Sequence, residues 1–133
     1  MARFLLDTNA CIEILRGRNP IFVQRFREHQ GEQPAICTVV WAELLVGARL
    51  SPDPATARRR LDVFAELPCP GFSRAAAEHY AEVRALLQRQ GQLIGPNDLF
   101  IASIALAHNL ILVTHNTREF SRVPGLALED WEM

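Results

Sequence analysis

Short apolar runs that end at polar residues alternate along this chain with longer segments whose apolar positions follow helical spacing. Continuous apolar runs of this length predict buried strands. Such runs lie at residues 3–6, 35–37 and 110–114, and a weaker one lies near 126–128. Residues 67–72 predict at most a short edge strand, because two prolines remove backbone donors there. Strands separated by helices indicate an α/β protein with a mainly parallel sheet and helices on both faces.

The helices between these runs are predicted from helical spacing and from residues that favour helix ends. Asn19 and Asp53, each followed by a proline, are predicted N-caps, as are Thr38 and Ser73. Gly91 is a predicted helix stop. The predicted helices span about 10–15, from 20 onward, 38–50, 54–67, 74–90 and 96–107.

Three carboxylates stand beside apolar segments. Asp7 ends the first apolar run, Glu43 is the sole charged residue between Ala35 and Ala48, and Asp98 opens an apolar stretch. A carboxylate beside packed apolar segments is costly unless a donor, a cation or a metal compensates its charge. If the three side chains converge, a hard divalent cation such as Mg²⁺ or Mn²⁺ is the simplest common partner.

The predicted elements favour such convergence. Asp7 and Asn116 follow the carboxyl ends of two strands, and Glu43 and Asp98 fall in the predicted first turns of helices. Sites in parallel α/β sheets form outside the carboxyl ends of the strands. Each acid also has a structural alternative: Asp7 as a helix cap, Asp98 as a charge complementing the helix dipole, and Glu43 as a side chain that reaches solvent.

Composition narrows the classes of protein. The chain has 133 residues, of which 49% are hydrophobic, so we expect one domain spanning residues 1–133. All fourteen basic residues are arginine. Without lysine the chain cannot be a P-loop protein, a typical response-regulator receiver or a haloacid-dehalogenase phosphatase, and Asn9 stands where the last class requires aspartate. The net charge of -1 gives no global basic field for a polyanion.

The cysteines and the apolar segments indicate a soluble, cytoplasmic protein. Cys11, Cys37 and Cys69 are widely spaced, which predicts reduced thiols in the core rather than a zinc site or a disulfide framework. The longest apolar region, residues 99–113, is shorter than the ~20 residues of a membrane span. The first apolar run is too short for a signal peptide.

Four segments resemble the signature segments of PIN-domain ribonucleases. They are residues 5–9 (LLDTN), 41–47 (WAELLVG), 95–102 (GPNDLFIA) and 113–120 (VTHNTREF). The ending, residues 122–131, resembles more narrowly that of the VapC toxins of toxin-antitoxin pairs. The resemblance implies a PIN-like three-layer sandwich, in which helices flank a central, mainly parallel sheet of four to five strands.

The resemblance also implies a Mg²⁺- or Mn²⁺-dependent endoribonuclease, usually dimeric, that a cognate VapB-type antitoxin inhibits in a hetero-oligomer. Asp7, Glu43 and Asp98 match the metal-binding acids of the family, and Asn116 matches a fourth catalytic position that is aspartate in some members. An amide adds no charge there, and Glu119 is a candidate to supply it. Further candidates, as donors that orient the carboxylates, are Thr8, Asn9 and Thr114.

Related toxins cut structured RNAs, such as loops of transfer or ribosomal RNA. Several arginines are candidate phosphate contacts around the acidic cleft: Arg16, Arg18, Arg49, Arg58, Arg59, Arg60, Arg84 and Arg89. An apolar groove for an antitoxin helix, or simply the core, is predicted from Ile12, Leu15, Trp41, Leu44, Leu45, Leu61 and Phe64. The alternatives are a metal-dependent DNA or flap-type nuclease and a non-catalytic domain that binds a partner.

Overall fold

A small parallel sheet forms the centre of the computed structural model, which describes residues 2–133. Its strands are β1 (Phe4–Leu6), β2 (Ile111–Val113) and β3 (Leu128–Glu129), in the order β1-β2-β3. Leu5 is opposite Leu112, and Leu112 is opposite Leu128. The α/β class and the parallel sheet are confirmed, whereas residues 2–133 form three strands rather than the predicted four to five.

The strands predicted at 35–37 and 67–72 run extended without forming a regular ladder. Ala35 makes an isolated bridge to Leu5. On its other side, the backbone amide of Ile36 donates to the carbonyl of Pro68, and that of Thr38 donates to the carbonyl of Pro70, both at 3.0 Å. Because proline has no N–H, these two residues accept bonds but return none, and the edge stays irregular.

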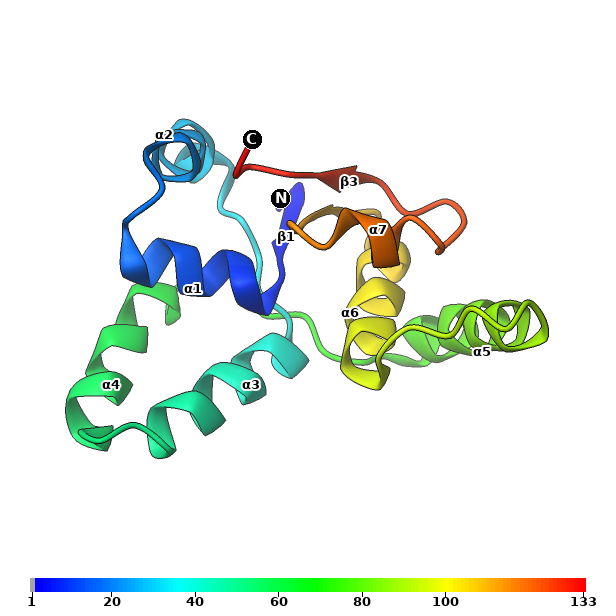
Figure 1. Cartoon of the computed structure of the whole chain (residues 1–133), viewed down its shortest axis with the longest axis horizontal. Coiled ribbons are helices and arrows are strands. Elements are labelled where there is room, and N and C mark those ends of the chain that lie inside the picture. Colours follow the sequence, from blue (N-terminus) through cyan, green and yellow to red (C-terminus); the bar gives the residue numbers. More distant parts are fainter. Residues whose placement is uncertain (1) are drawn as a thin grey trace.

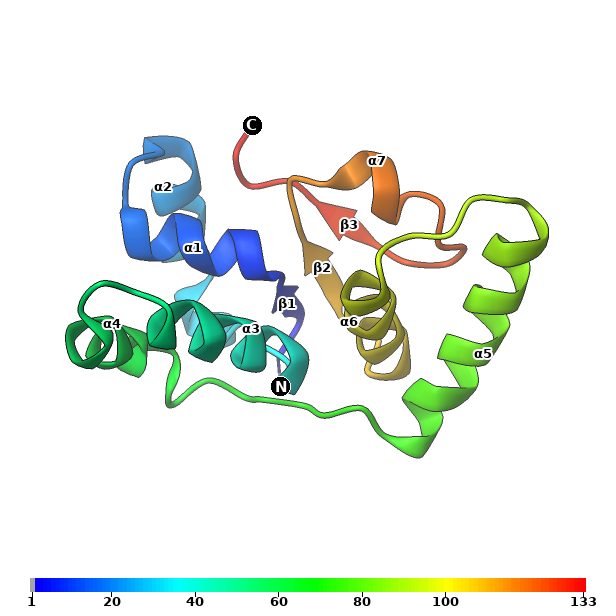
Figure 2. The ribbon, with the colours of Figure 1, turned by 60° about the horizontal axis from the view of Figure 1, so that its bottom comes forward.

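Helices cover both faces of the sheet, which gives three layers (Figures 1 and 2). Helices α1 to α4 lie on one side of the strands, and α5 and α6 lie on the other (Figure 2). The helices are α1 (Thr8–Arg16), α2 (Pro20–His29), α3 (Thr38–Arg49), α4 (Pro54–Arg60), α5 (Arg74–Arg89), α6 (Pro96–Ala107) and α7 (Thr117–Phe120). Two 3₁₀ turns, η1 (Gln30–Glu32) and η2 (Leu61–Phe64), follow α2 and α4.

Most helix starts agree with the predicted caps. Asn19, Asp53 and Ser73 each accept a hydrogen bond from the first turn of the following helix. The prediction that Thr38 is an N-cap is wrong: Cys37 occupies that position, and Thr38 is the first residue of α3. The helix predicted to run to residue 67 ends at Arg60, and η2 continues it with Leu61 and Phe64 buried.

The core is continuous across the sheet. Every residue of β1 is fully buried, and residues 101–105 of α6 are buried on all sides. Trp131, which is 1% exposed, closes one end of the core against Phe4 and Phe22. Among residues 2–133, no helix combines the length and the apolar character that crossing a membrane requires.

The three cysteines are free, as predicted. Cys11 and Cys37 are buried, and burial raises the pKa of both thiols. Cys69 is exposed, so the prediction of a core thiol is wrong for this residue. It lies between Pro68 and Pro70 on the irregular edge, which no further strand of residues 2–133 covers.

Candidate active site

Asp7 lies at the carboxyl end of β1 and caps helix α1. Its Oδ1 accepts a hydrogen bond of 2.7 Å from the backbone amide of Ala10, and its own amide donates to the carbonyl of Val113. The carboxylate is 5% exposed, and burial raises its pKa. Hydrogen bonds from Thr114 and Ala10 oppose this rise, whereas the charges of Glu132 and Glu43 add to it. Asp7 is therefore both a cap and a buried carboxylate close to other acids.

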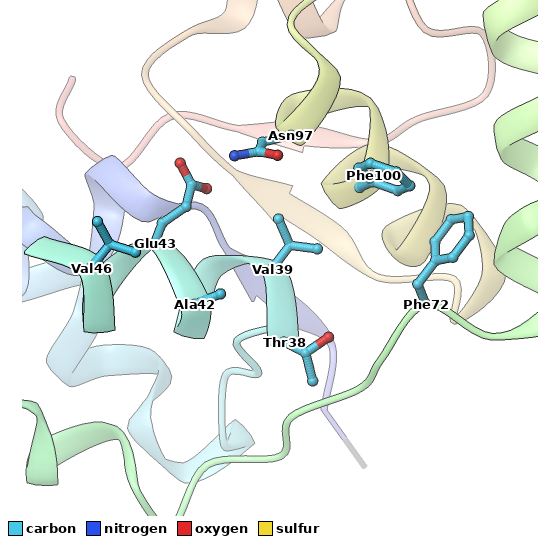
Figure 3. A pocket seen from close by; sticks show the side chains of 8 residues that line it. All are labelled: Thr38, Val39, Ala42, Glu43, Val46, Phe72, Asn97 and Phe100. Carbon is cyan, nitrogen blue, oxygen red and sulfur yellow. The ribbon is translucent and has the colours of Figure 1, made fainter.

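Glu43 lies in the second turn of α3 rather than in the first turn that the sequence predicted. Its Oε1 accepts a 2.8 Å hydrogen bond from the hydroxyl of Thr8, at the start of α1. The side chain borders a cleft of about 650 Å³ between α3 and α6, which Val39, Phe72 and Phe100 also line. Its carboxylate points toward the side of the cleft where α6 begins (Figure 3). Glu43 is half-buried at the edge of the cleft, and its hydrogen bond to Thr8 holds it in place.

Asp98 lies in the first turn of α6, as predicted. Its pKa is raised to about 6, first by burial and then by the negative charges of Glu119, Asp7 and Glu43, in that order. Three separate segments thus bring their carboxylates close enough to repel one another. The repulsion places Asp7, Glu43 and Asp98 within electrostatic range of one another, but their ligand atoms do not all lie within 4.8 Å of one another, so a shared metal site stays a prediction.

Asn116 and Glu119 form a hydrogen-bonded unit beside Asp98. The Nδ2 of Asn116 donates to Glu119 Oε2 at 2.7 Å, and the amide of Gly95 donates to Glu119 Oε1 at 3.0 Å. Glu119 therefore joins α7 to the start of α6. Both of its oxygens are engaged, and the carbonyl oxygen is the ligand atom that remains to Asn116.

The auxiliary residues differ in what they contact. Thr8 donates to Glu43, and Thr114 hydrogen-bonds Asp7 and accepts the backbone amide of Asn116 at 3.0 Å. Asn9 is exposed and makes no side-chain hydrogen bond within residues 2–133. Thr8 and Thr114 thus have the contacts that an orienting residue needs, and Asn9 has none of them.

Glu132 is the acid that the sequence analysis missed. The negative charge of Glu132 raises the pKa of Asp7, and this effect is larger than the effect of the charge of Glu43. Glu132 reaches this position because β3 pairs with β2 and carries the C-terminal segment back to the carboxyl end of the sheet. The signal in the sequence is the alternation Asp130, Trp131, Glu132 after a predicted strand, but that pattern does not name the partner strand.

The donor set fits a hard divalent cation. None of the ion pairs within residues 2–133 involves Asp7, Glu43 or Asp98, so no arginine or histidine neutralises them. Carboxylate oxygens, with an amide oxygen nearby, are the ligands that Mg²⁺ and Mn²⁺ prefer. A cation bound there would relieve the repulsion that raises the pKa of Asp98.

A three-layer fold with acids gathered at the carboxyl ends of its strands is consistent with the match of residues 4–126 to the PIN domain. The chain belongs to the PIN-domain family, and its relatives within that family are VapC ribonucleases. It is 40% identical over 132 residues to the tRNA(fMet)-specific endonuclease VapC of Shigella flexneri, which covers 98% of this chain and 99% of that protein.

Solved structures agree with this assignment. The crystal structure of DNA-bound VapBC from Salmonella typhimurium superposes with a TM-score of 0.91 at 34% identity, over 98% of this chain and 99% of that one. VapBC2 from Rickettsia felis, bound to a promoter DNA fragment, gives a TM-score of 0.89 at 35% identity, over 96% and 98% of the two chains. Nucleases with a PIN domain generally depend on divalent metal ions.

Proposed function

We propose that this protein is a divalent-metal-dependent endoribonuclease and the toxin of a toxin-antitoxin pair. The relatives are named as VapC ribonucleases, and solved structures similar to this one are VapBC complexes. Asp7, Glu43 and Asp98 are the proposed metal ligands, and Asn116 is a fourth catalytic residue. The cofactor is Mg²⁺ or Mn²⁺, and the protein acts in the cytoplasm.

The observation that carries this proposal is the group of carboxylates without a cation. Asp7 is buried, and the pKa of Asp98 is raised to about 6. Neither residue forms an ion pair within residues 2–133. A protein that used these acids only as helix caps would gain nothing by bringing them together, because like charges repel. A bound divalent cation would attract each carboxylate and so offset the repulsion between them.

The side chains hold the carboxylates ready for such an ion. A bound divalent ion lowers the pKa of a coordinated water and stabilises negative charge on phosphate oxygens. Thr114 and the Ala10 amide fix the orientation of Asp7, and Thr8 fixes that of Glu43. Glu119 holds the amide group of Asn116, so that its carbonyl oxygen is the atom left to bind an ion or a water. These contacts reduce the reorganisation needed when RNA arrives.

The proposed inhibitor is a VapB-type antitoxin bound beside the acids. A groove of about 280 Å³ runs between α1, α3 and α4, and Ile12, Leu15 and Leu44 line it. Glu43 and Thr8 border the same groove, so a helix seated in it reaches the candidate active site. Leu61 lines the groove as well, whereas Phe64 is buried in the core, and Trp41 and Leu45 are partly buried. A homodimer of the toxin within a toxin-antitoxin hetero-oligomer is part of this proposal.

The proposed substrate is structured RNA, such as a transfer or ribosomal RNA cut in a single-stranded loop. The relative from Shigella flexneri is named for transfer RNA. The candidate arginines are all exposed and can offset the repulsion between phosphates and the acidic cleft: Arg16, Arg18, Arg49, Arg58, Arg59, Arg60, Arg84 and Arg89.

The test is cleavage of total cellular RNA by the purified chain, free of antitoxin, with Mn²⁺ and with EDTA. We expect metal-dependent cuts at discrete sites, and a loss of at least about 100-fold in rate in Asp7→Asn, because the substitution removes a charged ligand. Asparagine still caps a helix, so α1 is kept. Asp53→Asn is the matched control. Asp53 is the N-cap of α4, so it also caps a helix, but it is exposed and is not one of the proposed ligands.

Three results would contradict the proposal. Cleavage that persists in EDTA or in Asp7→Asn would remove the metal or the residue from the mechanism. Preferential cleavage of DNA under the same conditions would identify a DNA nuclease. Intact RNA together with no Mn²⁺ binding would leave a domain that only binds a partner.

A further inference from the structure

A second group of metal-ligating side chains lies apart from the three proposed ligands. His115, Asp130 and Glu132 each offer one ligand atom, and these atoms lie within 4.8 Å of one another. The Nδ1 of His115 is 2.9 Å from Asp130 Oδ2 and 3.7 Å from Glu132 Oε2. Within residues 2–133, His115 is the sole ion-pair partner of either acid. The group holds two carboxylates and one imidazole.

The parallel sheet brings these residues together. Val113 pairs with Glu129, and the amide of Thr114 donates to the carbonyl of Glu129 at 3.0 Å. The next residue on each side is therefore carried to the same edge, His115 from the loop after β2 and Asp130 from the segment after β3.

The C-terminal segment is also fixed in position. Trp131 is 1% exposed, whereas its neighbours Asp130 and Glu132, which lie in a turn around it, are only partly buried. Arg25 donates to the carbonyl of Asp130 at 2.9 Å, and the amide of Glu132 donates to Asp130 Oδ1 at 2.9 Å. The two acids are thus held on one side of an anchored segment before any ligand binds.

The spacing suits a small transition-metal ion. Ligands at 2.0–2.1 Å in a tetrahedral site lie roughly 3.3 Å apart. The two distances from His115, 2.9 and 3.7 Å, lie on either side of that value. One imidazole with two carboxylates leaves a position open and favours Zn²⁺ over Mg²⁺, because Mg²⁺ prefers oxygen ligands alone.

We propose that His115, Asp130 and Glu132 form a second metal site, selective for Zn²⁺ and separate from the site of Asp7, Glu43 and Asp98. The site does not depend on nuclease activity. An ion bound by Glu132 would offset the negative charge that Glu132 places near Asp7. It adds to the proposed function a second ion with a different chemical preference.

Zinc binding by the full-length chain tests this site directly. Calorimetric titration with Zn²⁺ is made in a Cys69→Ser, Asp98→Asn background, which removes the exposed thiol and weakens the site of Asp7, Glu43 and Asp98, both of which compete for Zn²⁺. We expect one Zn²⁺ ion per chain, and an affinity at least about tenfold lower in His115→Asn and in Glu132→Gln. His108→Asn is the matched control, because His108 is an exposed histidine outside the group.

Substitution of the other site separates this proposal from the proposed function. Restoring Asp98 in this background should leave the Zn²⁺ affinity of the second site unchanged, and it should restore Mn²⁺ binding at the site of Asp7, Glu43 and Asp98. Wild-type chain that binds no Zn²⁺, or a His115→Asn affinity equal to that of His108→Asn, would overturn the second site. Absence of RNA cleavage with Zn²⁺ binding intact would overturn the nuclease and leave the second site supported.

Discussion

Asp98 is the residue at which function and stability oppose each other. Its ionised form is disfavoured by burial and by three neighbouring negative charges, of which Glu119 contributes most. The folded chain therefore binds a proton at Asp98 more tightly than the unfolded chain does. As the pH rises from 3.8 to about 6, the free energy of unfolding falls, and above that range the full penalty remains.

We expect Asp98→Asn to stabilise the metal-free protein near neutral pH by about 1–2 kcal/mol, a value reduced for partial solvent screening. The gain should vanish below pH 3.8, where the carboxyl of Asp98 is protonated in both states. Urea denaturation of wild type and Asp98→Asn in EDTA, near neutral pH and below pH 3.8, measures the difference in the free energy of unfolding under both conditions. A variant less stable than wild type near neutral pH would show that the carboxylates do not repel one another in the folded chain.

Among single residues, the sequence was sufficient to choose the acids but not to pair them. Asp7, Glu43 and Asp98 stand out because each is a charge beside apolar neighbours, and this is a local property. The bond from Thr8 to Glu43 depends on how α1 and α3 pack, and the bond from the amide of Gly95 to Glu119 depends on how α6 and α7 pack. Glu132 was missed for the same reason, because its proximity to Asp7 arises from strand pairing.

At the scale of elements, glycine acts in two different ways along this chain. Gly17 ends α1 with φ of +61°, and its amide donates to the carbonyl of Glu13. Gly47 lies inside α3 without a positive φ, and nothing lies within 4 Å of where a Cβ would stand. The first glycine is needed for its backbone conformation, and the second is not.

Alanine at these two positions should therefore have opposite effects. Gly17→Ala forces an L-residue into the left-handed region and should lower the free energy of unfolding by about 1 kcal/mol. Gly47→Ala should raise it by up to about 1 kcal/mol, because alanine favours a helix interior. Thermal denaturation of the two variants and of wild type shows whether each substitution lowers or raises the stability. Equal shifts in the same direction would refute the assignment of the cap.

Elements with local signals were predicted well, and elements that depend on distant partners were not. The caps Asn19, Asp53 and Ser73 accept bonds from their own next turn, so a short stretch of sequence determines them. The N-cap of α3 was predicted one residue late, at Thr38 instead of Cys37, because the amide of Thr38 bonds the distant carbonyl of Pro70. Residues 35–37 do not form the predicted regular strand because the segment beside them contains Pro68 and Pro70, which have no N–H to donate.

At the scale of the whole molecule, Trp131 joins the C-terminal segment to the core. It contacts Phe4 and Phe22 and stacks on His29 at 4.9 Å between ring centroids. These neighbours belong to β1 and α2, so the indole ties the end of the described chain to its beginning.

Trp131→Ala should cost about 3–5 kcal/mol, the range for removing a large buried aromatic. Trp41→Ala should cost less, because Trp41 is only partly buried on α3 and lies beside the exposed Arg58. Chemical denaturation of both variants measures the difference. Equal costs would mean that the C-terminal segment contributes no more to the core than one partly exposed side chain.

The pairing of β1 with β2 has a consequence for the order of events during synthesis. Asp7 is translated early, but its partners Val113 and Thr114 are translated late. A ribosome that is still making this chain therefore carries helices without an assembled catalytic cleft, since long-range strand pairing has to wait for both strands. The activity proposed for this fold becomes available only after β2 has been made, and we expect a product truncated before β2 to have no nuclease activity.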